Sequence, residues 1–196
     1  MVMSDQDNTE VSINGQVTSL TNGGEYVLFT GSTDDSTGRG DVITSSKPVL
    51  VMQFIDGGQY GSPATTGDPA MVVIPPVAQY LNDGIFTTPA TGFTQNSVTV
   101  VAKTAEVGAV TLDGTPISGS DFKELTGTDY SIARLFIGLG THRVSSTTGV
   151  GVFSYGYNPA DSYAYSAGSG LVNLITYPGG VAQVGYVTVD QITGDD

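Results

Sequence analysis

Three carboxylates lie close together in the segment DDSTGRGD, which runs from Asp34 to Asp41. Asp34, Asp35 and Asp41 offer the hard oxygen ligands that calcium prefers, so the segment is a candidate calcium site. Its spacing is not that of an EF-hand, because neither the central glycine nor the final glutamate of that loop is in place. The alternative is a solvated acidic loop, which is how most charge clusters behave. We expect no cofactor other than this calcium ion.

The same segment contains GRGD, the tripeptide motif that integrins read, in which Arg39 meets a carboxylate and Asp41 meets a metal. Integrins need this motif at the apex of a loop. The repeat described below instead places Asp41 opposite His142, two residues before a predicted strand. This alignment favours a strand entry for Asp41 over an exposed apex.

His142 is the only histidine, and it is the obvious candidate for acid–base chemistry. A catalytic triad needs a nucleophile and an orienting acid within hydrogen-bond reach of the histidine. Ser145 and Ser146 lie near it in sequence but without the spacing of a nucleophile elbow. Two carboxylates alone can hydrolyse a glycoside, so composition does not exclude an enzyme. We predict a structural or surface histidine and no catalysis.

A tyrosine-rich tract, YGYNPADSYAYSAG from Tyr155 to Gly168, is the strongest candidate for ligand binding. Tyrosine combines flat apolar area with a hydroxyl group and loses little entropy on binding, which suits recognition of sugars and proteins. The alternative is that these side chains pack on a sheet and their hydroxyls lie along its rim. The candidate ligand-binding residues are Tyr155, Tyr157, Asn158, Asp161, Tyr163 and Tyr165, together with Arg39 and Asp41 of the GRGD motif.

The charge of the chain limits its partners. Six Lys and Arg residues stand against nineteen Asp and Glu residues, which gives a net charge of -13. Such a surface repels nucleic acid and anionic lipid, so we expect neither as a partner. The chain has no cysteine, no apolar run long enough to span a membrane and no secretion signal behind Met1. Its start, MVMSDQDNTE, indicates a segment of a longer surface protein with an added initiator.

Short apolar runs separated by turn sequences predict an all-β fold. Turn signals such as Asn14-Gly15 and Asp113-Gly114 lie between the runs, and about ten strands at this spacing indicate an antiparallel β-sandwich or jelly-roll-like barrel. Only Ser118–Leu125 has room for one helical turn, with Ser120 as its cap. The expected strands are Val11–Ile13, Glu25–Thr30, Pro48–Phe54, Met71–Pro75, Ser97–Lys103, Ala109–Leu112, Tyr130–Ile137, Gly149–Tyr155, Leu171–Tyr177 and Val184–Val189.

The segment VITSSKPVLVMQF, Val42–Phe54, has the same pattern as RVSSTTGVGVFSY, Arg143–Tyr155. The flanking segments also correspond, which predicts an internal duplication with a period of about 100 residues. We therefore expect two β modules, residues 1–93 and 94–196, packed as one compact unit; these are called the first half and the second half below. The matched apolar positions include Ile43 with Val144, Val49 with Val150, and Val51 with Val152.

Several motifs, in order along the chain, resemble the N-terminal domain of the IgGFc-binding protein, a domain that also occurs in large bacterial surface proteins. The similarity covers about Thr9 to Leu171. The motifs are SSKPVLVMQF, DPAMVVIPPVAQY, FTTP, VTLDG, YSIARLFIGLGTHRVSS and YGY.

The resemblance implies an extracellular, all-β, non-catalytic recognition or adhesion module. We expect a module of a bacterial surface protein that binds a glycan or protein on a host, prey or neighbouring cell. The family's motifs are those of a scaffold, so the resemblance assigns no ligand-contacting residue. The alternative is a structural spacer in a large surface protein, with no ligand of its own. A binder is expected to show a concave or aromatic-lined patch on one face, and a spacer is not.

Overall fold

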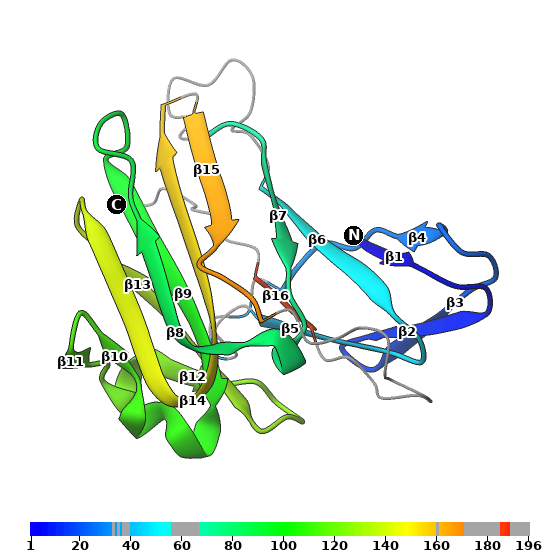
Figure 1. Ribbon diagram of the computed structural model, residues 1–196. Coiled ribbons are helices and arrows are strands. Elements are labelled where there is room, and N and C mark those ends of the chain that lie inside the picture. Colours follow the sequence, from blue (N-terminus) through cyan, green and yellow to red (C-terminus); the bar gives the residue numbers. More distant parts are fainter. Residues whose placement is uncertain are drawn as a thin grey trace.

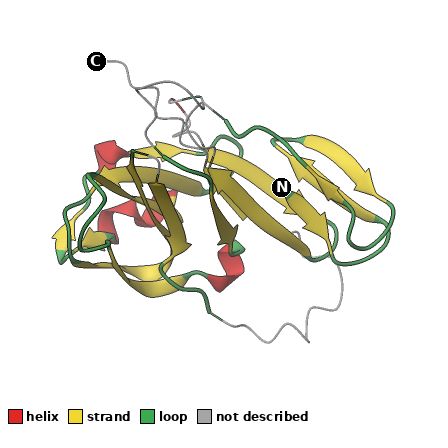
Figure 2. Ribbon diagram, turned by 90° about the horizontal axis from the view of Figure 1, so that it is seen from above, coloured by secondary structure: helices red, strands yellow, loops and turns green. Residues whose placement is uncertain are grey.

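The computed structural model describes residues 1–32, 34, 36, 40–55, 67–159 and 161–170, and the backbone of 185–188. Nearly all of the regular structure is antiparallel strand, which confirms the predicted all-β sandwich class. Figure 2 shows that helix is confined to short turns. The predicted turn in Ser118–Leu125 is the 3-10 helix η4 (Gly119–Asp121), although its cap is Ser118 and not Ser120. Two further 3-10 turns, η2 (Val77–Gln79) and η3 (Thr104–Ala109), were not predicted.

The first sheet has the strand order β4-β1-β6-β7. Its central strand β6 pairs with β1 through Val51 and Val2, and with β7 through Val51 and Ile74. The strands are β1 (Val2–Ser4), β4 (Tyr26–Val27), β6 (Val49–Ile55) and β7 (Ala70–Ile74).

The second sheet has the order β16-β5-β2-β3. Its hairpin turns at Asn14 and Gly15, whose φ angles of 50° and 84° fit the turn that an Asn-Gly pair favours between two strands. The strands are β2 (Thr9–Ile13), β3 (Gln16–Leu20), β5 (Gly40–Ser45) and β16 (Gly185–Thr188).

The largest sheet has eight strands and is built around β14 (Thr141–Asn158), which pairs with β8, β9, β10 and β15. These strands lie together on one side of the molecule, and the first two sheets extend on the other (Figure 1). The remaining strands are β8 (Leu81–Thr87), β9 (Gln95–Lys103), β10 (Thr111–Leu112), β11 (Thr115–Pro116), β12 (Phe122–Glu124), β13 (Tyr130–Phe136) and β15 (Asp161–Ser166).

Strand β9 separates two hydrophobic cores and is buried on both faces. Val98 and Val100 belong to the core enclosed by the large sheet, together with Val144 and Val152. Val101 points the other way, into the core shared with the first two sheets. Successive side chains of a strand alternate between its faces, so a single strand serves both cores. Strand β9 therefore forms the wall between the two cores and contributes side chains to both.

The same strand register occurs on both sides of the molecule. In the first half Ile13 pairs with Ile43, and in the second half Leu112 pairs with Val144. The duplicated segments differ in one respect: residues 42–54 are divided between β5 and β6 in two sheets, whereas residues 143–155 lie within β14. The pairing of β14 with β8 shifts between Ser145 and Val150 at the corresponding place. Internal duplication stays a prediction, and the matching strand register is consistent with it.

Each half adds its last strand to a sheet of the other half. Strand β8 precedes the predicted boundary at residue 93, yet it pairs with β14, where Gly84 lies opposite Val144. Strand β16 lies at the other end of the chain and pairs with β5, where Gly185 lies opposite Ile43. The predicted division into residues 1–93 and 94–196 is thus crossed by strand pairing in both directions.

Candidate ligand-binding surface

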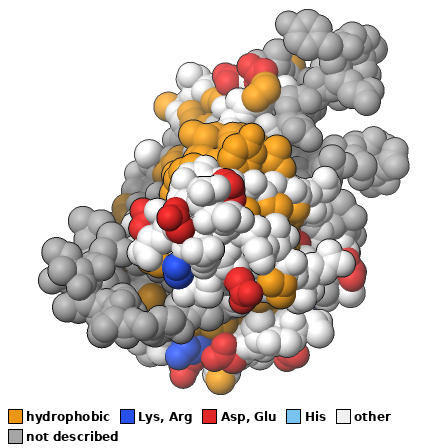
Figure 3. Space-filling model, turned by 90° about the vertical axis from the view of Figure 1, so that its right-hand side faces the viewer, with side chains coloured by type: hydrophobic (Ala, Val, Ile, Leu, Met, Phe, Trp, Pro, Cys, Tyr) orange, Lys and Arg blue, Asp and Glu red, His pale blue; other side chains and the backbone are white. Residues whose placement is uncertain are grey.

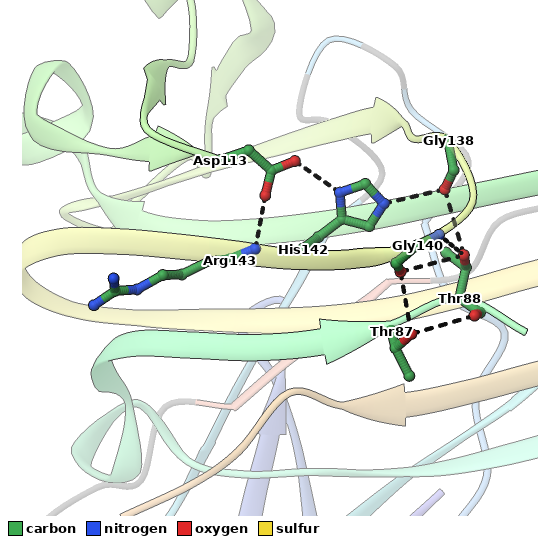
Figure 4. Close-up of polar contacts among 7 residues, drawn as sticks. All are labelled: Thr87, Thr88, Asp113, Gly138, Gly140, His142 and Arg143. Atoms are coloured by element: carbon green, nitrogen blue, oxygen red, sulfur yellow. Dashed lines mark hydrogen bonds and ion pairs between the residues drawn. The ribbon is translucent and has the colours of Figure 1, made fainter.

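His142 is held between two oxygen atoms (Figure 4). Its Nδ1 lies 2.7 Å from Asp113 Oδ2, and its Nε2 lies 3.1 Å from the carbonyl oxygen of Gly138. Both oxygens are acceptors, so both hydrogen bonds form only when both ring nitrogens carry protons. A general base needs a free nitrogen lone pair directed at its substrate. This geometry fits the structural histidine that the sequence predicted.

The residues around His142 also form hydrogen bonds with the backbone. Asp113 Oδ1 accepts a hydrogen bond from the amide of Arg143 at 2.8 Å, and the His142 hydrogen bond to this carboxylate lowers the pKa of Asp113. Ser145, the nearby hydroxyl, is bonded to Thr111 Oγ1 at 2.8 Å. Figure 4 shows that the Thr87, Thr88 and Gly140 contacts close the adjoining loop. These hydrogen bonds hold the start of strand β14 against the Asp113 turn. We call the contacts of Asp113 with His142 and with the Arg143 amide the clamp of the second half.

Asp41 is buried, with 1% of its surface exposed, at the start of β5. Its Oδ1 accepts from Asn14 Nδ2 at 2.7 Å, and its Oδ2 accepts from the amide of Ser32 at 3.0 Å. Burial raises the pKa of this carboxyl group above its ordinary value. The oxygens of Asp41 thus face the protein interior, which argues against its being offered to an integrin, and calcium binding by Asp41 stays a prediction. The alternative, a strand entry, is confirmed.

Of the other two carboxylates of the acidic segment, only Asp34 is among the described residues. Asp34 is exposed and its Oδ1 accepts from the amide and hydroxyl of Ser36 at 2.9 and 2.7 Å. Asp35 and Arg39 lie outside the described residues. Among the residues that are described, no three His, Asp or Glu side chains gather closely enough to hold a metal ion. Calcium binding at this segment stays a prediction.

Two tyrosines of the predicted ligand-binding tract are buried. Tyr155 and Tyr157 are 8% and 5% exposed, and they pack with Ile55 in a small core cluster between β6 and β14. Their rings contact one another edge to face, with centroids 5.9 Å apart. Their burial favours the alternative, in which these two side chains pack on the sheet, over contact with a ligand.

The rest of the tract lies on the opposite face of the β14–β15 hairpin or at its tip. Tyr163 donates its hydroxyl to Asn96 Oδ1 at 2.8 Å, and Tyr165 donates its hydroxyl to the carbonyl oxygen of Thr87. Asn158 and Asp161 face each other across the hairpin, where Asp161 is exposed. Ligand contact by Asn158, Asp161, Tyr163 and Tyr165 stays a prediction.

The outer face of the first sheet is apolar, which sequence reasoning missed. Leu50, Met71 and Val73 are 37%, 54% and 47% exposed. None of the four strands contains a charged residue. Cross-strand pairing makes the patch contiguous. We call this surface the uncharged face; its residues are Met3, Tyr26, Leu50, Met52, Phe54, Met71 and Val73.

A groove of about 550 Å³ opens where the uncharged face meets strand β15. Its lining includes Leu50 and Val73 of the first sheet, Tyr165 of the predicted tract, and Pro75 and Pro76. Figure 3 looks onto the side of the molecule that carries β1 and β4, and shows hydrophobic side chains gathered in a continuous field. Most monomeric proteins cover an apolar area of this kind, which makes it a candidate binding surface.

These features define a class: an all-β domain with hydrogen-bonded polar clamps between its strands and an open apolar surface. The described residues include no helix long and apolar enough to cross a membrane. A model of the IgGFc binding protein family matches residues 1–156, and the chain belongs to this family. This range agrees with the resemblance found in the motifs. Neither the curated proteins nor the solved structures include a match to the chain.

Proposed function

We propose that this protein is a non-catalytic extracellular recognition module that attaches a surface protein to a protein ligand. Membership of the IgGFc binding protein family supports a ligand-binding role outside the cell. The single observation that carries the proposal is the exposed uncharged face with its groove. A spacer has no need of such a face, which costs solubility and invites aggregation.

The geometry around His142 supports the non-catalytic part of the proposal. Both ring nitrogens face protein oxygens, and the neighbouring Ser145 hydroxyl is engaged by Thr111. A glycan remains an alternative ligand, since Tyr165 lines the groove and Tyr163 lies beside it with ring centroids 5.9 Å apart. Protein is favoured because most of the remaining lining is apolar, with Gln79, Ser166 and Ser169 as its polar members, and sugars need more polar partners.

The test is an array of secreted and cell-surface proteins and glycans, with the antibody Fc fragment included because of the family's name. We expect the purified chain to bind at least one protein, and we expect Leu50→Asp to abolish that binding. Binding to glycans alone would overturn the choice of a protein ligand. A folded chain that binds nothing on the array would overturn the recognition role and leave the spacer.

A further inference from the structure

The four methionines of the chain all lie in the first sheet or at its start: Met1, Met3, Met52 and Met71. Met3, Met52 and Met71 belong to the uncharged face. Methionine is unbranched and polarisable, so a surface rich in it adapts to apolar side chains of different shape. This composition suits a partner that presents a row of aliphatic side chains.

Carboxylates stand at both ends of the uncharged face. Asp5 and Asp7 are exposed beyond the end of β1, and the amide of Asp5 bonds to the carbonyl oxygen of Pro48, a residue that lines the groove. Asp68 is exposed at the other end, just before β7. Lys47 is the nearby cation, and its Nζ donates to the carbonyl oxygen of Asp7 at 2.6 Å. The surface is thus apolar in the middle and acidic at its ends.

The net charge of -13 argues against a second copy of this chain as the occupant, because two such faces would bring their acidic ends together. A partner with an apolar centre and cationic flanks meets both requirements at once. The face is about 15 Å wide across its strands and about 20 Å long, which matches one helix of about 14 residues.

We infer that the uncharged face binds an amphipathic, positively charged helical segment of a partner protein, with the helix's apolar stripe on Met71 and Val73 and its lysines or arginines near Asp5 and Asp68. This inference rests on the proposed function and names the kind of protein ligand. In this mode of peptide recognition an amphipathic helix lies on an apolar surface and contacts it through its apolar residues at i, i+3, i+4 and i+7.

The experiment uses synthetic helical peptides of about 14 residues with a leucine stripe and one tryptophan. The chain has no tryptophan, so emission excited at the indole comes from the peptide alone. Three peptides are compared: lysine on the polar face, glutamate on the polar face, and a scrambled lysine peptide that lacks the stripe. We expect the amphipathic lysine peptide to bind with a blue-shifted emission and the other two to bind at least about tenfold more weakly.

Matched variants separate the apolar contribution from the charge. Met71→Gln with Val73→Thr keeps the shape and the net charge but adds polar atoms to the face, and should weaken binding about tenfold. Ile85→Thr makes the same kind of change on strand β8, where Ile85 is 62% exposed, and should leave binding unchanged. Asp5→Asn with Asp68→Asn should weaken binding and reduce its dependence on salt.

The inference is overturned if the glutamate peptide binds as well as the lysine peptide, or if the Met71 and Val73 changes act no more strongly than Ile85→Thr. It is also overturned if sedimentation shows a dimer that the Met71 and Val73 changes dissociate, since the occupant is then a second copy. An array ligand whose binding survives those changes would leave the proposed function standing and this inference wrong. If the chain binds nothing on the array, the proposed function is wrong, and this inference, which rests on it, is wrong as well.

Discussion

His142 donates from Nδ1 to Asp113 Oδ2 over 2.7 Å, and this contact has the same place in the second half that the contact of Asn14 with Asp41 has in the first. Asn14 and Asp113 both begin a turn with positive φ, 50° and 52°. In each case the side chain also accepts from the backbone amide that follows its partner, Val42 or Arg143. The same pair of hydrogen bonds thus occurs in each half and is formed by different side chains.

The clamp of the second half predicts a stability that depends on pH. The hydrogen bond from His142 lowers the pKa of Asp113, so this carboxylate stabilises the fold above the ordinary Asp pKa of about 3.9 and loses that effect as the pH falls through its lowered pKa. Asp113→Asn keeps the turn, as Asn14 shows. We expect a loss of less than about 1 kcal/mol at pH 6, because Asp113 is half exposed.

The prediction is checked by urea denaturation of the unchanged chain and of Asp113→Asn between about pH 6 and pH 2. The difference between their denaturation midpoints should vanish at the acidic end. A difference that is constant over this range would show that the charge of Asp113 contributes nothing.

The converse exchange predicts the opposite pH dependence. Asn14→Asp retains the turn, as Asp113 shows, but replaces the amide donor to Asp41 by a second carboxylate. We expect a destabilisation of about 1–2 kcal/mol at neutral pH, because Asp41 is buried and its pKa is already raised by burial. Acidification should relieve this cost, since protonation of either group removes the repulsion.

The measurement for Asn14→Asp is the thermal midpoint at two pH values, with Asn14→Gly as the control that loses the amide without adding charge. An equal loss in both variants, at both pH values, would contradict the role assigned to repulsion.

Neighbouring residues on opposite faces of β6 predict opposite outcomes. Val51→Asp places an unpaired carboxylate in the core, where Val51 is 5% exposed, and Val152→Asp does so in the other core. Each should prevent folding, because burying such a group costs several kcal/mol of a total stability near 5–15 kcal/mol. Leu50→Asp, on the uncharged face, should fold. Circular dichroism and a cooperative melt decide this, and a cooperative melt of Val51→Asp would show that β6 is misplaced.

The crossing of strands between the halves predicts the effect of shortening the chain. A chain that ends at residue 170 lacks β16 and leaves β5 with an unpaired edge, so it should lose stability by at least about 2 kcal/mol or expose a sticky edge and aggregate. A chain that ends at residue 190 keeps β16 and is the control. Equal denaturation midpoints for the two would show that β16 adds nothing to the second sheet.

The sequence was informative where a local pattern decides the structure. The turns at Asn14-Gly15 and Asp113-Gly114 need positive φ, which these residues tolerate, and short β-type apolar runs located β6 and β9. It could not show that β5 and β6 separate into two sheets while β14 continues, because that depends on a turn at Ser46–Pro48 and on which neighbours are available. Strand Leu171–Tyr177 lies outside the described residues.

The candidate site was harder to predict, for a physical reason. A strand with apolar residues at nearly every position is normally buried on both faces, so Leu50 and Val73 gave no sign that they would be exposed. The burial of Asp41 was equally hidden, since its donors Asn14 and Ser32 are distant in sequence. Of the predicted ligand-binding residues in the tyrosine tract, Tyr165 lines the groove together with the first sheet, next to Ala164 and Ser166.

Strand β9, which lies between the two cores, also determines which backbone amides exchange most slowly with solvent. In solvent deuterium oxide its central amides should be the last to exchange, because releasing them requires both cores to open at once. Among the described strands, the two-residue strand β4 pairs with β1 and with no other, so it should exchange by fraying. The sheet that carries the uncharged face is thus expected to open locally while β9 keeps its hydrogen bonds.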